Sequence, residues 1–191
     1  MSELDAEWER VRAEVERRAS KSGEGDVADY LRLRATNDAA RKIGIDWLLD
    51  MFTRAAGEAN RRGATINLEE SSRTSTGTTT GDVPDTHRFT IGASTMVGVR
   101  CVMRVGIKTL TVEAGYPRAP ADGFIRGGGL ARANITHFGD KRAGQKLMLV
   151  QRGTDAPGWF VVEDDDAQVK IGARFAESDI ARHLIHFAQV S

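Results

Sequence analysis

The sequence lacks most of the features that would reveal a function directly. Its 191 residues include a single cysteine, Cys101, which cannot form an internal disulfide and favours a reducing compartment. The amino-terminal residues lack the apolar core of a signal peptide, and no apolar run approaches the roughly 18 residues of a membrane span. No cofactor motif is present either. We therefore expect a cytoplasmic protein that uses no cofactor and does not contact a membrane.

Net charge is also absent, but the charges are unevenly distributed along the chain. The 27 basic side chains balance the 27 acidic ones. Residues 1–63 hold 12 Lys/Arg and 13 Asp/Glu, a net charge of −1, whereas residues 86–152 hold 11 Lys/Arg and 3 Asp/Glu, a net charge of +8. A local excess of this kind attracts anions or nucleic acid. Alternatively, the acidic run at residues 163–166 offsets this charge once the chain has folded.

The length and the 40% hydrophobic content suit one globular domain with its own core. An amphipathic helix is predicted ahead of it, because apolar side chains recur every three or four positions in residues 3–20, at Leu4, Trp8, Val11 and Val15. Such a narrow stripe usually lies along another helix. We assign residues 1–22 to a helix that docks or forms a homodimer, and residues 23–191 to a single α+β domain.

Residues 26–62 also have a helical pattern, with Asp26 as a candidate N-cap. Gly44 lies inside this segment, and glycine costs about 1 kcal/mol in a helix interior. We therefore expect two helices that meet near Gly44. Gly63 follows the basic residues Arg61 and Arg62, which is typical of a helix C-terminus.

From residue 64 to residue 175 apolar and polar residues alternate, as they do in half-buried strands. This pattern predicts a curved antiparallel meander of six to eight strands. The clearest strand is 95–105, and the others lie at residues 64–69, 107–118, 130–138, 146–152, 158–163 and 168–175. We interpret the Ser/Thr-rich residues 71–86 as a loop, with an edge strand ending at Pro84 as the alternative. Asp164–Asp166 read as an acidic turn between the last two strands.

The chain ends in a predicted helix at residues 178–189, with Ser178 as its cap and Ile180, Leu184 and Phe187 as its buried stripe. The order of elements is helices, then an antiparallel meander, then one helix. This order defines the α+β class. We expect the sheet to curve around this last helix or around the apolar helical face between Trp47 and Ala59.

Three consecutive glycines, Gly127 to Gly129, raise the question of a phosphate-binding loop. Such a loop leads from a strand into a helix, whose free backbone N–H groups face the anion. Residues 130–138 instead alternate as a strand does, and no Lys-Ser or Lys-Thr pair follows the glycines. We therefore interpret the run as a bend or a close approach of backbones.

Histidines provide the candidate metal ligands. His183 and His186 are three residues apart on the last predicted helix, a spacing that can share a metal ion. His137 and Asp140 would add ligands if the end of their strand lay nearby. No HExxH motif accompanies them, so we keep this metal site as an alternative only.

The sequence favours a protein that is not an enzyme, without settling the point. Cys101 falls on the apolar face of a strand, where burial keeps a thiol inert. No serine or threonine stands in a GxSxG context. Paired carboxylates could come from Glu113 and the acidic run at 163–166, but such a run is usually a solvated turn. Nucleic acid is a less favoured partner, because the basic segment has few aromatic residues and no basic recognition helix.

The leading hypothesis is a non-enzymatic binding or accessory protein. Its basic sheet face would present four arginines to an acidic protein or an anionic ligand: Arg100, Arg104, Arg126 and Arg132. The alternative is a small enzyme or ligand carrier with a pocket between the sheet and the C-terminal helix, in which His137, His183 and His186 would act.

Overall fold

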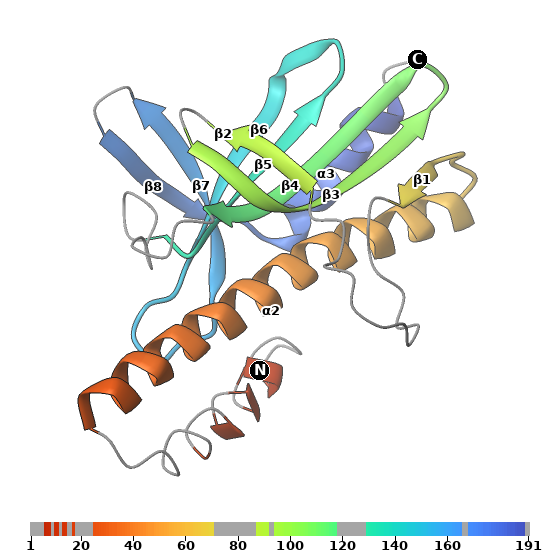
Figure 1. The fold of residues 1–191 in the computed structure, drawn as a ribbon. Helices are drawn as coiled ribbons and strands as arrows, with labels where there is room; N and C mark the ends of the chain where they lie inside the picture. Colours follow the sequence, from red (N-terminus) through yellow and green to blue (C-terminus); the bar gives the residue numbers. More distant parts are fainter. Residues whose placement is uncertain are drawn as a thin grey trace.

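The computed structural model confirms the α+β class (Figure 1). Among the described residues, eight antiparallel strands form one sheet, and the helices α2 (Gly25–Arg61) and α3 (Glu177–Gln189) pack against it. The residues described are 6–8, 10–11, 13–14, 17, 25–70, 87–91, 94–117, 129–165 and 168–189.

The sheet is a meander in which sequential strands from β3 onwards pair with their neighbours. Its order is β1-β3-β4-β5-β6-β7-β8, and β2 also pairs with β3. The strand bounds are Asn67–Glu70 for β1, His87–Ile91 for β2, Ser94–Val105 for β3, Lys108–Pro117 for β4, Ala131–His137 for β5, Asp140–Val150 for β6, Gly158–Asp165 for β7 and Gln168–Arg174 for β8. The long strand β3 therefore serves as the partner of both β1 and β2.

Helix α2 is one continuous helix, so the prediction of two helices meeting at Gly44 was wrong. Gly44 lies where α2 touches the sheet: a Cβ atom there would be 2.6 Å from both methyl carbons of Leu149. The Gly44 carbonyl also accepts a hydrogen bond of 2.7 Å from Trp159 Nε1. The missing side chain brings the helix close to the sheet, and this packing outweighs glycine's low helix propensity.

Alternation divides the sheet into two faces with different burial. One face packs against α2 and α3 and forms the main core, in which Leu48 and Phe52 of α2 meet Val112, Ile135 and Leu149 of the sheet. The other face, which we call the opposite face, carries the polar positions of β3, β4 and β5 and two small apolar clusters. The main core therefore fixes which side chains point away from the helices.

Helix α2 ends as the sequence predicts. It stops at Arg61, and Gly63 follows with φ of 101°, a left-handed conformation that glycine adopts without strain. The side chain of Asn60 then holds the start of the next segment: its Nδ2 donates to the Ile66 carbonyl at 2.8 Å, and its Oδ1 accepts from the Ile66 N–H at 2.7 Å.

Helix α3 begins at Glu177, and its cap differs from the prediction. The N–H of Ala176 donates to Asp179 Oδ2 at 2.8 Å, and the Asp179 N–H donates back to the Ala176 carbonyl at 3.0 Å. Ala176 therefore occupies the cap position, and the Asp179 carboxylate accepts the hydrogen bond of its backbone N–H. Ser178 is not the cap. The predicted buried stripe of Ile180, Leu184 and Phe187 is confirmed.

Several predicted boundaries change. Asp164 and Asp165 belong to strand β7 rather than to a turn, and Asp166 lies outside the described residues. Strand β6 begins at Asp140, earlier than its predicted start at residue 146. The sequence pattern did not indicate β2 at all. The predicted loop at residues 71–86 lies outside the described residues.

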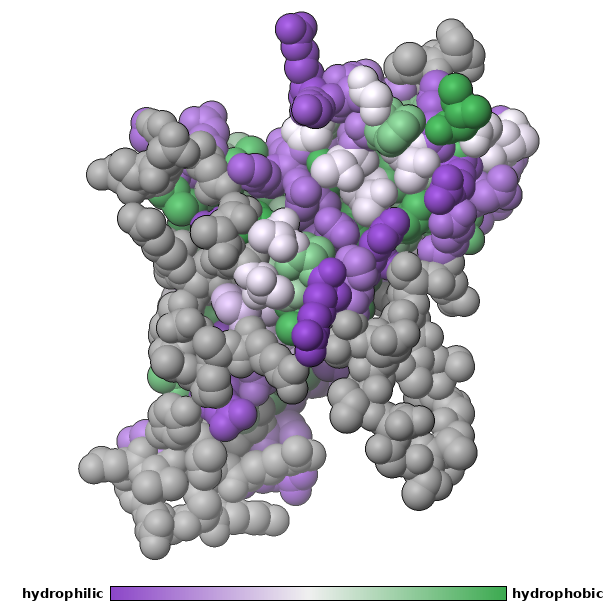
Figure 2. All heavy atoms as spheres, turned by 45° about the horizontal axis from the view of Figure 1, so that its top comes forward, coloured by the Kyte–Doolittle hydropathy of each residue, from purple (hydrophilic) through white to green (hydrophobic). Residues whose placement is uncertain are grey.

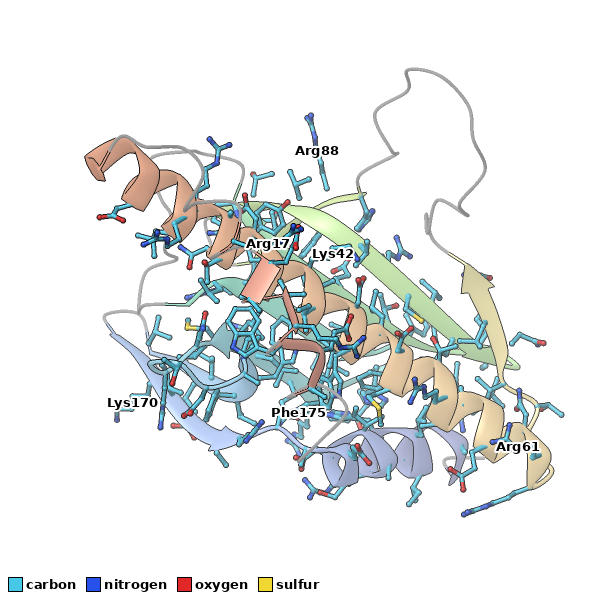
Figure 3. The ribbon with its side chains drawn as sticks, turned by 90° about the horizontal axis from the view of Figure 1, so that it is seen from below. Arg17, Lys42, Arg61, Arg88, Lys170 and Phe175 are labelled. Atoms are coloured by element: carbon cyan, nitrogen blue, oxygen red, sulfur yellow. The ribbon has the colours of Figure 1, made fainter. Side chains whose placement is uncertain are left out.

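The described residues near the amino terminus are helical and lie below α2 (Figures 1 and 3). Trp8 is buried in the main core, Val11 packs against that core, and Trp8 Nε1 donates to the Thr154 carbonyl at 3.4 Å. These apolar side chains of the predicted stripe thus face the chain's own core. The homodimer remains a prediction.

None of the helices that the structure describes is both long enough and apolar enough to cross a membrane.

Candidate functional site

Two regions collect the predicted site residues, and the first is the opposite face of the sheet. Arg100 alternates with core-facing residues of β3, and Arg132 lies between the buried Ala131 and Ala133 of β5. Both arginines therefore lie on the opposite face. The strand register aligns Arg100 with Glu113, and Glu113 in turn with Asn134. We call the surface formed by Arg100, Arg132 and the residues between them the arginine face.

The guanidinium of Arg100 is partly buried on this face. Its Nε is buried and has no hydrogen-bond partner among the described residues. The carboxylate across from it, Glu113, makes its own close contact with His87, with 2.9 Å between Glu113 Oε1 and His87 Nε2. A buried N–H group without an acceptor is costly, so an anion that accepted a hydrogen bond from it would remove that cost.

Two glycines adjoin both arginines. Gly98 pairs with Gly115, and Gly115 pairs in turn with Arg132. A Cβ atom on Gly98 would lie 2.0 Å from the Ala114 carbonyl oxygen, so β3 and β4 approach here too closely for side chains. Gly98 and Gly115 consequently add no side chains to the arginine face beside Arg100 and Arg132, and Gly115 itself is buried. Glycine within a strand often marks a site where another group approaches the backbone.

We do not count the other two predicted arginines, Arg104 and Arg126, as part of the arginine face. Arg104 lies on the same side of β3 as Arg100, but its Nε is 2.5 Å from Glu69 Oε1 of the neighbouring strand β1. Its charge is therefore balanced within the chain. Arg126 lies outside the described residues, as do Gly127 and Gly128.

The third glycine of that run, Gly129, is described, and it supports the interpretation as a close approach. A Cβ atom there would lie 2.5 Å from Cγ of Met148. The next residue, Leu130, donates its N–H to the Leu149 carbonyl at 2.8 Å, and the chain continues into strand β5 rather than a helix. Strand structure after the glycines does not suit a phosphate-binding loop.

The second region is a histidine cluster, which brings together all three histidines of the predicted alternative. His137 ends β5, while His183 and His186 lie on α3. The rings of His137 and His183 stack at 5.3 Å between centroids, and those of His137 and His186 meet edge to face at 5.2 Å. The end of the β5 strand therefore lies beside the helix, which is the condition that the sequence left open.

Hydrogen bonds determine which ring nitrogens of His137 and His183 carry a proton. His183 Nε2 lies 2.9 Å from Gln145 Oε1, which accepts, so His183 donates from Nε2. Its Nδ1 is then free to accept from His137 Nε2, 3.0 Å away. Two protonated rings would place two N–H groups against each other at this contact. The arrangement therefore requires that at least one of the two rings is neutral.

Burial acts in the same direction on both rings. It lowers the pKa of His183 to about 4, and the neighbouring His137 adds to this effect by charge repulsion. It also lowers the pKa of His137, to which repulsion by His186 contributes, while Asp140 acts in the opposite direction. The stacked pair is consequently neutral at neutral pH.

His186 pairs with a carboxylate instead. Its Nε2 donates to Asp140 Oδ2 at 3.0 Å. The other carboxylate oxygen accepts from the backbone N–H groups of Arg142 at 3.0 Å and Ala143 at 3.3 Å. The Arg142 N–H is the main reason that the pKa of Asp140 is lowered. The negative charge of Asp140 is thus engaged on both oxygens.

A pocket of about 250 Å³ opens beside this cluster, at the junction of the sheet with α3. Its lining consists of Lys108, Thr109, His137, Phe138, Gly139, Asp140, His186 and Phe187. Within the described part of the chain, no group of three or more His, Cys, Asp or Glu side chains is arranged to hold a metal ion. The histidines come together through contacts with one another, with Gln145 and with Asp140.

Some of these features had no usable signal in the sequence. Gln145 and Lys108 are ordinary surface types on alternating strands, and nothing local indicates that they border the histidines. Gly98 and Gly115 did carry a signal, since glycine weakens a strand unless a close approach requires it. Cys101 is partly buried and packs against the main core, as predicted.

No protein-family model matches this chain, and the comparisons with curated proteins and with solved structures gave no match either.

Proposed function

We propose that this protein is a non-enzymatic binding or accessory protein whose arginine face engages an anionic group, carried by an acidic protein or by a small ligand. The observation that carries the proposal is the buried Nε–H of Arg100, which has no acceptor among the described residues and lies on the same face as Arg132. The proposal rests on this local geometry rather than on the net charge, which is zero for the whole chain.

The chemistry of arginine suits this role. Its planar guanidinium presents donors that match a carboxylate or a phosphate in two parallel hydrogen bonds. A partly buried guanidinium also gains more from such a contact than an exposed one, because the surroundings screen it less. Gly98 and Gly115 add no side chains to the arginine face beside Arg100 and Arg132.

The test compares two arginines on the same strand face. Arg100→Gln and Arg104→Gln remove the same charge, but Arg104 is already paired with a carboxylate, that of Glu69. We expect Arg100→Gln to weaken binding of pyrophosphate or of a hexaglutamate peptide by about tenfold, the loss of a charge-assisted hydrogen bond. Arg104→Gln should change it by about twofold or less. Isothermal titration calorimetry at two salt concentrations measures both effects.

Equal weakening by the two substitutions would mean that net charge alone attracts the probe, and would contradict the proposal. Absence of binding by the unmodified protein to either probe would also contradict it. Circular dichroism of both variants confirms that each remains folded.

A further inference from the structure

One end of the sheet exposes two large apolar side chains on neighbouring turns. Ile107 lies in the turn between β3 and β4 and is 93% exposed, and Phe138 lies in the turn between β5 and β6 and is 79% exposed. Figure 2 shows hydrophobic residues among hydrophilic ones at its upper right, over the ends of β3 and β4. We call this region, together with the pocket beside the histidine cluster, the hairpin end.

The two turns are held in fixed positions next to each other. The N–H of Phe138 donates to the Thr109 carbonyl of β4 at 2.8 Å, which ties the second turn to the strand that follows the first. Each turn also contains a glycine with positive φ, 57° at Gly106 and 86° at Gly139. Single exposed apolar residues are common on protein surfaces, but a fixed pair beside a pocket is typical of a binding surface.

The size of the pocket indicates which kind of chemical group it would bind. At about 250 Å³ it is below the roughly 300–1,000 Å³ of pockets that enclose free small molecules. The rings of Phe138 and Phe187 contribute to its lining, so it suits an apolar group. A cavity of this size and character fits a single large side chain, the usual anchor in a protein interface.

The charges around the pocket indicate which charge its partner should carry. Lys108 lines it, and Lys141 and Arg142 follow directly after the second turn and are exposed. The acidic residue in the pocket lining, Asp140, is already engaged by His186 and by two backbone N–H groups. Among the described residues of the hairpin end, the uncompensated charge is therefore positive, which favours an acidic partner.

We propose that the hairpin end docks an acidic polypeptide segment that inserts one large apolar side chain into the pocket. Ile107 and Phe138 flank the inserted residue, and Lys108, Lys141 and Arg142 meet the acidic residues on either side of it. The surface goes beyond the arginine face: it lies at the strand ends and takes an apolar anchor, whereas Arg100 lies five residues from the end of β3, roughly 17 Å along the strand.

The test uses three short fluorescent peptides: an acidic peptide with one central phenylalanine, the same peptide with alanine at the centre, and a version with lysines in place of its acidic residues. Fluorescence anisotropy measures their binding to the full chain. We expect the first peptide to bind at least about fivefold more tightly than the other two. Phe138→Ser and Ile107→Ser should each remove the preference for phenylalanine over alanine.

Matched variants distinguish the hairpin end from the rest of the protein surface. Leu33→Ser changes an apolar residue on α2 that is 53% exposed and should leave the preference for phenylalanine intact. Arg100→Gln, on the separate arginine face, should also leave the preference for phenylalanine over alanine intact, so failure of the arginine face is distinguishable from failure of the hairpin end.

Three results would overturn the inference. The first is equal binding of the phenylalanine and alanine peptides. The second is binding to anionic phospholipid vesicles that Phe138→Ser abolishes while the peptides do not bind, which would identify a lipid surface. The third is a dimer in sedimentation analysis that the same substitution dissociates, which would identify a second copy of this chain as the occupant.

Discussion

Gly44 shows how one residue sets the distance between helix and sheet. It lies within α2, yet its backbone is nearly in contact with Leu149 of β6, and its carbonyl accepts from Trp159 of β7. Both partners are buried in the main core. The absence of a side chain thus permits a close contact between helix and sheet at this point.

This position yields a prediction with a built-in control. Gly44→Ala gains about 1 kcal/mol of helix propensity, but its methyl group must displace the buried Leu149, and overpacking of this kind costs about 1–3 kcal/mol. We expect a net loss of about 1 kcal/mol in the free energy of unfolding. Urea denaturation measures it.

Gly57 provides the control on the same helix. Among the described residues, a Cβ atom there has only Arg61 Nη1 nearby, at 3.8 Å, so Gly57→Ala should stabilise the protein by up to about 1 kcal/mol. Stabilisation by both substitutions would show that the contact between α2 and Leu149 is looser than described.

Gly44 also shows the limit of sequence reasoning at this scale. From sequence, an interior glycine predicts a break, because propensity is the only local information. The compensating contacts come from residues more than one hundred positions away, Leu149 and Trp159, and no local pattern connects them.

At the scale of elements, the histidine cluster joins helix α3 to the hairpin of β5 and β6. His183 on the helix contacts His137 at the end of β5 and Gln145 on β6, and the buried ring of Phe175 lies 6.1 Å from it, just before α3 (Figure 3). Besides the buried stripe of α3, the docking of this helix therefore includes a contact between His137 and His183 that requires at least one neutral ring.

Acid should weaken this docking. The pKa of His183 is lowered to about 4 in the folded protein, whereas an unfolded histidine titrates near 6.5. Between these two values the unfolded chain binds more protons than the folded one, so the free energy of unfolding falls as the pH falls. Above about pH 6.5 this contribution is constant. His137, whose pKa is also lowered, acts in the same direction.

We expect the melting temperature to fall between about pH 7 and pH 4.5, and His183→Gln to reduce that fall. His87→Gln is the control, since His87 lies on β2 and contacts Glu113 outside the cluster. Thermal unfolding followed by circular dichroism gives the slope of melting temperature against pH for each variant. An unchanged slope in His183→Gln would show that the cluster does not govern the acid response.

The elements themselves were largely predictable. Alternation located β3, β4, β5, β7 and β8 within a few residues, and the stripe of Ile180, Leu184 and Phe187 located α3. Strand β2 was missed although the buried Phe89 and Ile91 alternate with the exposed Arg88 and Thr90, because it directly follows the Ser/Thr-rich residues that we interpreted as a loop. The cap of α3 was misplaced by two positions because Ser178 has the stronger capping preference, whereas the observed cap depends on the side chain of Asp179.

At the scale of the whole molecule, the register of the sheet decides which predicted residues meet. The sequence grouped four arginines by their position in a basic segment. The register places Arg100 and Arg132 on one face beside Gly98 and Gly115 and gives Arg104 a partner on β1. Such cross-strand neighbours are set by pairing over long sequence separations, which charge patterning along the chain does not specify.

The most direct test of this account observes the Nε–H group of Arg100 itself. In isotope-labelled protein, its NMR signal is assigned by its loss in Arg100→Lys, and pyrophosphate or hexaglutamate peptide is then added. The account predicts that the Arg100 Nε–H signal shifts with saturation and exchanges more slowly with water, while the Arg104 signal stays nearly constant. An unchanged Arg100 signal in the presence of bound probe would contradict the claim that the arginine face is the binding site.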